Sequence, residues 1–228
     1  MHHLLLLHGA IGAKDQLQAL SDELKNKYIV HTLNFKGHGS EPIPDKLSIE
    51  TFAEDVLNYL SLHNIHSINI FGYSMGGYVA LYLAKHHPQK INRIFTFATK
   101  FLWTPEIASR EIAMLDANKI SNKFPAFAQQ LEKRHYPNDW KLLLEKTSDM
   151  MIDLGNNNLL HLHDYKTINH SILIGIGDKD RMVPLEETIE VYKNLPNANF
   201  IVFPKTHHLI EKINLERLTR EIELFFNN

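Results

Sequence analysis

The chain has 228 residues, of which 44% are hydrophobic and 22% charged, a composition typical of a folded globular protein. Its 24 Lys and Arg residues nearly balance 26 Asp and Glu residues, and the formal net charge is −2. That balance gives no global positive field, so we expect no nucleic-acid partner. The chain has no cysteine, which excludes disulfides, thiolate metal sites and cysteine nucleophiles.

The first residues do not resemble a secretory signal, which needs a basic start, a longer apolar stretch and a small-residue cleavage site. No apolar run approaches the ~18 residues needed to cross a bilayer. We therefore expect a cytoplasmic protein with no membrane partner. A monomer and a homodimer are both compatible with the sequence.

Short apolar runs alternate with longer stretches of helical periodicity along most of the chain. The predicted strands are 4–7, 28–35, 68–72, 91–98, 172–176 and 199–203, and the helices between and after them are 15–27, 49–63, 75–86, 184–194 and 214–226. The strand segments are almost continuously apolar, as in parallel strands covered on both faces. The pattern predicts an α/β fold with a parallel sheet and right-handed crossovers.

Residues 100–170 interrupt this alternation, because they have helical patterns and no convincing strand. Thr104, Pro105 and Glu106 predict a helix start, and further helices are expected at 124–134 and 138–154, with a stop at 155–158. The sequence thus predicts one core domain, residues 1–99 and 171–228, with a helical cap at 100–170 inserted over one end of the sheet.

A strand-to-helix junction at residues 72–76 carries the most informative motif. Gly72-x-Ser74-x-Gly76 follows the predicted strand and is followed at once by a helix. This is the pattern of a nucleophile elbow, a strained turn that projects a serine hydroxyl above the sheet. The serine also lies at a helix N-terminus, where free N–H groups favour negative charge.

A serine hydroxyl needs a base, and two later strand ends supply the groups. The strand 172–176 is followed by Asp178 and Asp180, and the strand 199–203 by His207 and His208. Since carboxyl ends of parallel strands share one edge of a sheet, a carboxylate and an imidazole are expected beside Ser74. The order serine, acid, histidine is the one that this architecture uses.

These segments together resemble the α/β-hydrolase fold, in its small, lidded serine esterase type. The resemblance spans nearly the whole chain and includes His8-Gly9, Gly37-His38-Gly39, the 72–77 elbow, Gly177-x-x-Asp180-x-x-Val183-Pro184 and His208-Leu209. It implies a mostly parallel sheet of about six strands flanked by helices, with a helical lid. It also implies Ser74 as nucleophile, His208 as general base and later acid, and Asp180 as the carboxylate that orients His208. The family spacing favours Asp180 over Asp178 and His208 over His207.

Attack on a carbonyl creates an oxyanion, which backbone N–H groups must stabilise. The elbow offers the N–H of Met75. By resemblance, the second donor is the N–H of Ala10, in the small-residue loop after the first strand. His8 is expected to support this loop through hydrogen bonds rather than to act in catalysis.

The cap is expected to set specificity. Tyr73 and Trp103 are candidates to line the substrate pocket, together with further aromatic residues of the cap: Phe101, Phe124, Phe127, Tyr136 and Trp140. The segment His161-x-His163-Asp164 has metal-ligating residue types but no third ligand at a recognisable spacing. We expect no metal and no cofactor.

The sequence thus predicts a serine hydrolase that cleaves a small or medium ester or thioester, an acyl substrate, through an acyl-enzyme. A lyase or a C–C bond hydrolase on the same scaffold, or a non-hydrolytic ligand receptor, are the alternatives. The elbow is shared with menaquinone-pathway lyases, which usually carry an arginine where this chain has Tyr78, a departure that weakens the case for an acidic substrate.

Overall fold

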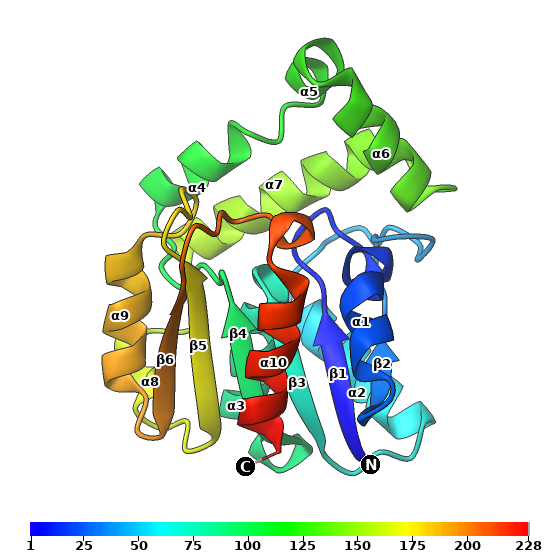
Figure 1. The fold of residues 1–228 in the computed structure, drawn as a ribbon. Helices are drawn as coiled ribbons and strands as arrows, with labels where there is room; N and C mark the ends of the chain where they lie inside the picture. The colour runs from blue at the N-terminus through cyan, green and yellow to red at the C-terminus, as the bar shows by residue number, and fades with distance from the viewer. Residues whose placement is uncertain (228) are drawn as a thin grey trace.

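The computed structural model describes residues 1–227, which form one parallel sheet of six strands with helices on both faces (Figure 1). The strands are β1 His2–Leu7, β2 Tyr28–Thr32, β3 Ile68–Tyr73, β4 Ile91–Phe97, β5 Ser171–Gly177 and β6 Ala198–Phe203. Their order is β2-β1-β3-β4-β5-β6, and every neighbouring pair is parallel. The prediction of an α/β fold with about six strands is confirmed.

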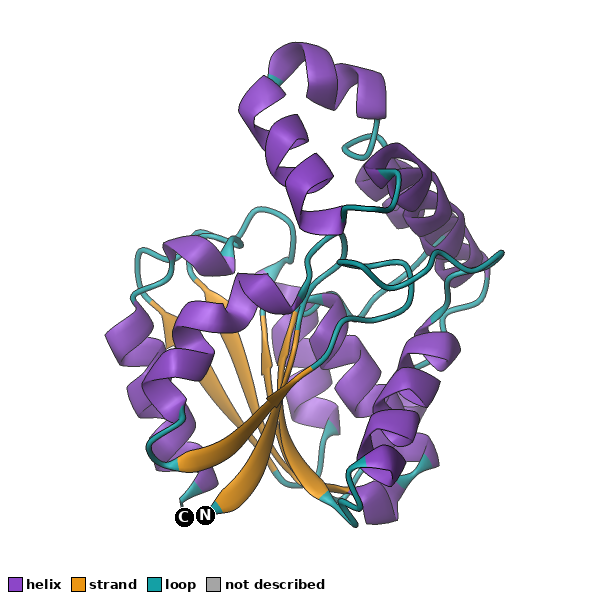
Figure 2. Ribbon diagram, turned by 90° about the vertical axis from the view of Figure 1, so that its right-hand side faces the viewer, coloured by secondary structure: helices purple, strands orange, loops and turns teal. Residues whose placement is uncertain are grey.

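Both faces of the sheet are buried, and alternate side chains of a strand enter different hydrophobic clusters. In β1, Leu5 and Leu7 belong to one cluster, whereas Leu4 and Leu6 belong to the other. The helices α2 (Ile49–Leu62), α3 (Met75–His86) and α9 (Leu185–Asn194) cover the first face, and α1 (Gln18–Leu24) and α10 (Leu215–Phe226) the second (Figures 1 and 2). Burial from both sides explains the continuous apolar runs.

Two core elements are shorter than the sequence predicted. The strand β2 ends at Thr32, because the chain then turns away and the amide of Phe35 donates to Nε2 of His8 instead of joining the sheet. The helix expected at 15–27 is a 3₁₀ turn, Lys14–Leu17, followed by α1, which ends at Leu24.

Residues 100–170, called here the helical insertion, connect β4 to β5. They contain α4 Pro105–Ile112, α5 Ala117–Lys123, α6 Pro125–His135, α7 Trp140–Asn156 and α8 Leu162–Tyr165. The side chain of Thr104 caps α4 by accepting a hydrogen bond from the amide of Ile107. The helix α4 packs along α7, and α5 packs against α6, above the carboxyl ends of the strands (Figure 2). The short α8 instead packs on α9, beside the sheet.

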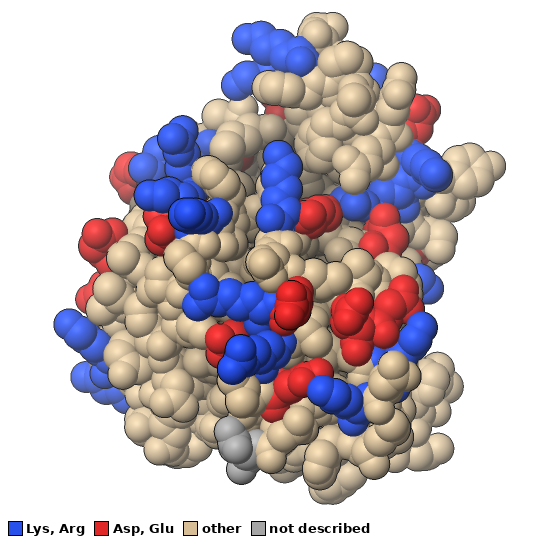
Figure 3. Space-filling model, viewed as in Figure 1, with Lys and Arg blue, Asp and Glu red and all other residues tan. Residues whose placement is uncertain are grey.

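The described surface agrees with the balanced composition. On the face shown in Figure 3, basic and acidic side chains are interspersed rather than separated into large areas of one sign. Each helix within residues 1–227 is too short or too polar to span a bilayer.

Candidate active site

Ser74 lies at the junction of β3 and α3, in a backbone conformation that few residues other than glycine adopt. Its φ is 50° and its ψ −117°, and its amide donates to the carbonyl oxygen of Phe97. The flanking glycines allow this turn because a Cβ on Gly72 would lie 2.5 Å from the carbonyl oxygen of Gly76. A Cβ on Gly76 would lie equally close to the carbonyl oxygen of Leu7 in β1. Close packing of β3, α3 and β1 thus holds the serine in this turn.

The structure brings Ser74, His208 and Asp180 together in one chain of hydrogen bonds. The Oγ of Ser74 lies 3.3 Å from Nε2 of His208, and Nδ1 of His208 lies 2.8 Å from Oδ2 of Asp180. Asp180 follows β5 and His208 follows β6, so both reach Ser74 from the same edge of the sheet. This geometry suits transfer of the serine proton to the imidazole while the carboxylate orients the ring.

The carboxylate of Asp180 is held by its other oxygen as well. Its Oδ1 accepts hydrogen bonds from the amides of Met182 and Val183, at 2.8 and 2.9 Å. Burial opposes ionisation of Asp180, but the hydrogen bond and positive charge of His208, with these two amides, outweigh it and lower the pKa of Asp180. The group is therefore an oriented carboxylate near neutral pH.

The neighbouring residues that the sequence left as alternatives have other surroundings. Asp178 is exposed, and its Oδ1 accepts from the amide of Thr206, which closes the turn after β6. His207 is exposed, whereas only 11% of the His208 side chain is exposed. Of the two pairs, Asp180 and His208 are the members that contact each other.

Two backbone amides beside Ser74 have no hydrogen-bond acceptor within residues 1–227: those of Ala10 and Met75. Both residues line the same cavity as Ser74. The loop of Ala10 is held by His8, whose Nδ1 donates to the carbonyl oxygen of Gly9 at 2.8 Å and whose Nε2 accepts from Phe35. His8 thus supports the loop through hydrogen bonds, and the two amides that have no acceptor among residues 1–227 belong to residues that line the cavity beside Ser74.

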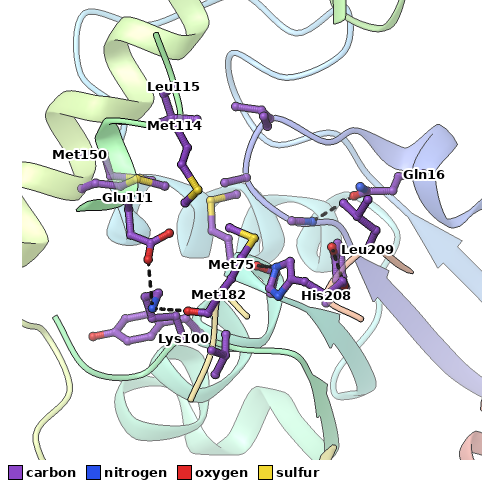
Figure 4. A pocket seen from close by; sticks show the side chains of 18 of the residues that line it. Gln16, Met75, Lys100, Glu111, Met114, Leu115, Met150, Met182, His208 and Leu209 are labelled. Atoms are coloured by element: carbon purple, nitrogen blue, oxygen red, sulfur yellow. Dashed lines mark hydrogen bonds and ion pairs between the residues drawn. The ribbon is translucent and has the colours of Figure 1, made fainter. Parts of the chain in front are cut away.

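A cavity of about 300 Å³ lies between the sheet edge and the helical insertion, with Ser74 and His208 in its wall (Figure 4). All the methionines of the chain except Met1 line it: Met75, Met114, Met150, Met151 and Met182. The sequence patterns did not predict this methionine wall. In the sequence, Met75 directly follows Ser74 and Met182 lies two residues after Asp180. Met150 and Met151 are consecutive in one amphipathic helix. These positions were the only indication that methionines line the cavity.

The aromatic residues predicted for the pocket divide into three groups. Tyr73, Trp103 and Phe127 line the cavity. Phe101 and Trp140 are buried in hydrophobic clusters, and Phe124 and Tyr136 are exposed on the insertion, 57% and 77%, away from the cavity lining. Tyr78 also lines the cavity, but its hydroxyl donates to Asn158 and accepts from the amide of Leu160, which fastens the end of the insertion.

An ion pair is buried in the cavity wall opposite His208 (Figure 4). Nζ of Lys100 lies 3.2 Å from Oε1 of Glu111 in α4 and donates to the carbonyl oxygen of Met182 at 2.7 Å. Each charged side chain is only 9% exposed. The pair therefore joins the insertion to the loop that carries Asp180.

Glu111→Gln is expected to lower the free energy of unfolding by about 3–5 kcal/mol, because it leaves the Lys100 ammonium buried without its counter-charge. Urea denaturation monitored by circular dichroism measures this. Asp153→Asn is the matched control, since Asp153 is also in the insertion and forms only an exposed ion pair with Lys46 of the core, so its loss should change stability little. Equal stability of Glu111→Gln and the wild type would contradict the expectation.

Three buried histidines lie beneath the loop of residues 9–12: His8, His38 and His135. Burial lowers the pKa of His8 to about 4, and it also lowers the pKa values of His38 and His135. Nε2 of His38 has no hydrogen-bond partner among residues 1–227. The fold therefore keeps these imidazoles neutral where an unfolded chain would bind protons.

Acid is expected to destabilise the fold before most carboxylates titrate. Since the folded pKa values lie below the unfolded value of 6.5, stability is complete above about pH 6.5 and falls as the pH drops toward 4. Each histidine contributes a slope of up to about 1.4 kcal/mol per pH unit. Urea denaturation between pH 7 and 5 measures the slope, which should flatten in His38→Phe and not in His66→Phe, where the histidine is exposed. An unchanged slope in His38→Phe would show that His38 does not contribute to the pH dependence of stability.

The histidines of the segment 161–164 serve the local structure. The rings of His161 and His163 stack with centroids 5.6 Å apart, and the Asp164 carboxylate accepts from the amide of His161 and pairs with Lys85. Within residues 1–227 there is no group of three His, Cys, Asp or Glu side chains placed to hold a metal ion.

This fold agrees with that of the proteins that the chain resembles. A family model described as the alpha/beta hydrolase fold matches residues 2–147, more than half of the chain, and the chain belongs to that family. It is 24% identical over 208 residues to 2-hydroxymuconate semialdehyde hydrolase of Pseudomonas putida, a match that covers 83% of this chain and 73% of that protein.

Two solved structures show the same fold over the whole chain. The enol-lactonase of Burkholderia xenovorans has a TM-score of 0.81 at 18% identity, covering 100% of this chain and 92% of that one. A thermophilic esterase of Thermogutta terrifontis has a TM-score of 0.76 at 22% identity, covering 100% and 90%. The resemblance predicted from the sequence motifs is confirmed at the level of family and fold.

Proposed function

We propose that the protein is a serine hydrolase that cleaves a small or medium carboxylic ester or thioester through an acyl-enzyme intermediate. One observation supports this above all: Ser74, His208 and Asp180 form a single chain of hydrogen bonds in the wall of a largely apolar cavity. The serine is in the strained turn that exposes its hydroxyl to a ligand.

In this proposal Oγ of Ser74 attacks the substrate carbonyl carbon while Nε2 of His208 accepts the serine proton. The carbonyl oxygen becomes an oxyanion, which the amides of Ala10 and Met75 stabilise. The imidazolium then gives its proton to the departing alcohol or thiol, and the acyl group stays on Ser74. A water molecule, deprotonated by His208, attacks the acyl-enzyme, releases the acid and restores the serine. Asp180 stabilises the imidazolium in both halves.

The helical insertion is proposed to act as the lid and to select the acyl group. Its residues Met114, Met150, Met151 and Leu154 contribute an apolar wall that faces Ser74 across the cavity. In this division the catalytic core is 1–99 with 171–228, and 100–170 is the lid. A wall of this kind favours an aliphatic acyl chain over a charged one.

A C–C bond hydrolase on the same scaffold is the second candidate. The relative named 2-hydroxymuconate semialdehyde hydrolase and the charged pair of Lys100 and Glu111 in the cavity wall favour it. Such an enzyme would release a carboxylic acid and a carbon fragment without an alcohol, so analysis of the products distinguishes the two.

Labelling with a fluorophosphonate probe, followed by peptide mapping, tests the proposal. We expect one covalent adduct on Ser74, absent from Ser74→Ala, and turnover of p-nitrophenyl esters from acetate to octanoate. Tight ligand binding without labelling or turnover would instead indicate a non-hydrolytic receptor and refute the proposal.

A further inference from the structure

The helical insertion contacts the loop of the proposed oxyanion hole at Ile11. The carbonyl oxygen of Ile11 lies 3.0 Å from Nε2 of His135, the last residue of α6. The side chain of Ile11 packs against the hydrophobic cluster of the insertion, which contains Ile120, Leu131, Trp140 and Leu144. The insertion therefore holds this residue of the core by both its backbone and its side chain.

The hydrogen bonds of His135 fix which of its nitrogens carries the proton. The amide of Gly39 points at Nδ1 from 3.0 Å, and an amide N–H can only donate. Nδ1 is therefore the acceptor, and the neutral ring carries its proton on Nε2, which donates to Ile11. The His135 side chain is buried, as is its bond with Gly39, and its bond with Ile11 is partly buried.

The bond to Ile11 determines the direction of the Ala10 amide through two peptide planes. The carbonyl of Ile11 and the N–H of Gly12 belong to one trans peptide and point in opposite directions. That N–H donates to the carbonyl oxygen of Gly9 at 3.1 Å. The carbonyl of Gly9 and the N–H of Ala10 belong to another trans peptide, so fixing the carbonyl aims the N–H toward the opposite side.

The loop needs such support because Ile11 has a φ of 52°. This left-handed region is unfavourable for a β-branched residue, which would relax to another conformation if released. His8 holds the Gly9 carbonyl from the core, and His135 holds the Ile11–Gly12 peptide from the insertion. Release of either side would allow the Ala10 amide to turn.

We propose that His135 is a positioning residue that orients the Ala10 amide, so that the oxyanion hole is complete only while the helical insertion is seated on the core. This inference rests on the proposed function, since it requires that Ala10 stabilise an oxyanion. It makes the insertion a part of the catalytic apparatus in addition to a wall of the cavity.

Kinetics of His135→Phe with p-nitrophenyl butyrate test this inference. Removal of one oxyanion donor typically costs about 10²–10³-fold in kcat, and we expect misorientation to cost about 10–100-fold, with KM nearly unchanged. The inhibition constant of an alkylboronic acid, whose adduct with serine is tetrahedral, should rise in parallel with the loss of kcat/KM. His135→Gln keeps one donor and one acceptor in its side chain and should recover part of the lost kcat.

Asp153→Asn is the control, because its ion pair with Lys46 joins the insertion to the core without contacting residues 9–12, Gly39 or His135. A folded His135→Phe with the kcat and boronate affinity of the wild type would overturn the inference, as would an equal loss of kcat in Asp153→Asn. If Ser74→Ala retained wild-type turnover, the proposed function itself would fail. Loss of turnover in Ser74→Ala with full activity in the His135 variants would refute the positioning role alone.

Discussion

Ser74→Ala is expected to lower kcat for p-nitrophenyl butyrate by about 10⁴–10⁶-fold, the largest effect of any single change in this chain. The variant keeps the cavity, the imidazole and both free amides, so the loss measures covalent catalysis by the hydroxyl. Substrate binding should change little, because the hydroxyl is a small part of the cavity wall. Steady-state kinetics at saturating substrate, with enzyme concentrations determined by absorbance, measures the effect.

Ser48→Ala is a suitable control for that experiment. The Ser48 hydroxyl accepts from the amide of Thr51 and caps α2, so its loss should cost about 1 kcal/mol of stability and leave kcat unchanged. A Ser74→Ala enzyme as active as Ser48→Ala would show that another group is the nucleophile.

Asp180→Asn is expected to lower kcat by about 10⁴-fold while the fold stays intact. The amides of Met182 and Val183 need an acceptor at Oδ1, so the asparagine oxygen should remain there. Its NH₂ group then faces Nδ1 of His208, which must give up its proton and accept. The imidazole proton moves to Nε2, where it blocks transfer from Ser74.

Asp178→Asn provides the matched comparison for Asp180→Asn. It changes a carboxylate two residues away, whose side chain accepts a hydrogen bond from the amide of Thr206 and does not contact His208. Its kcat should be close to that of the wild type, with the same kinetic assay. Comparable losses in the two variants would mean that the loop structure, rather than the tautomer of His208, controls the rate.

The core of the site could be predicted because local backbone packing dictates it. A Cβ at Gly72 or Gly76 would clash with backbone atoms. The spacing of the two glycines around Ser74 is therefore a steric requirement of the turn. The positions of Asp180 and His208 follow from topology, since the ends of adjacent parallel strands β5 and β6 lie on one edge. Such constraints act over a few residues and are visible in a single sequence.

The cavity wall was harder to predict because it depends on how the insertion helices pack on one another. Phe101 and Trp140 have the composition of pocket residues, but the cores formed with the sheet and with α6 bury them. The helix α5 has one buried residue, Ile120, and therefore little periodicity to detect. His135 gave no signal at all, because its importance comes from contacts with Gly39 and Ile11, about a hundred residues away.

The methionine side chains around the cavity affect both the range of acyl groups that the cavity accepts and its sensitivity to oxidation. Each is unbranched and has three rotatable bonds, so the wall can change shape by rotation without backbone movement, and activity should vary only gradually across acyl groups of different bulk. In a chain without cysteine, methionine sulfur atoms are the main targets of peroxide, and every methionine except Met1 lines this cavity. Conversion to sulfoxides would make the wall polar, so exposure to an oxidant should weaken turnover of long aliphatic acyl groups more than that of acetate.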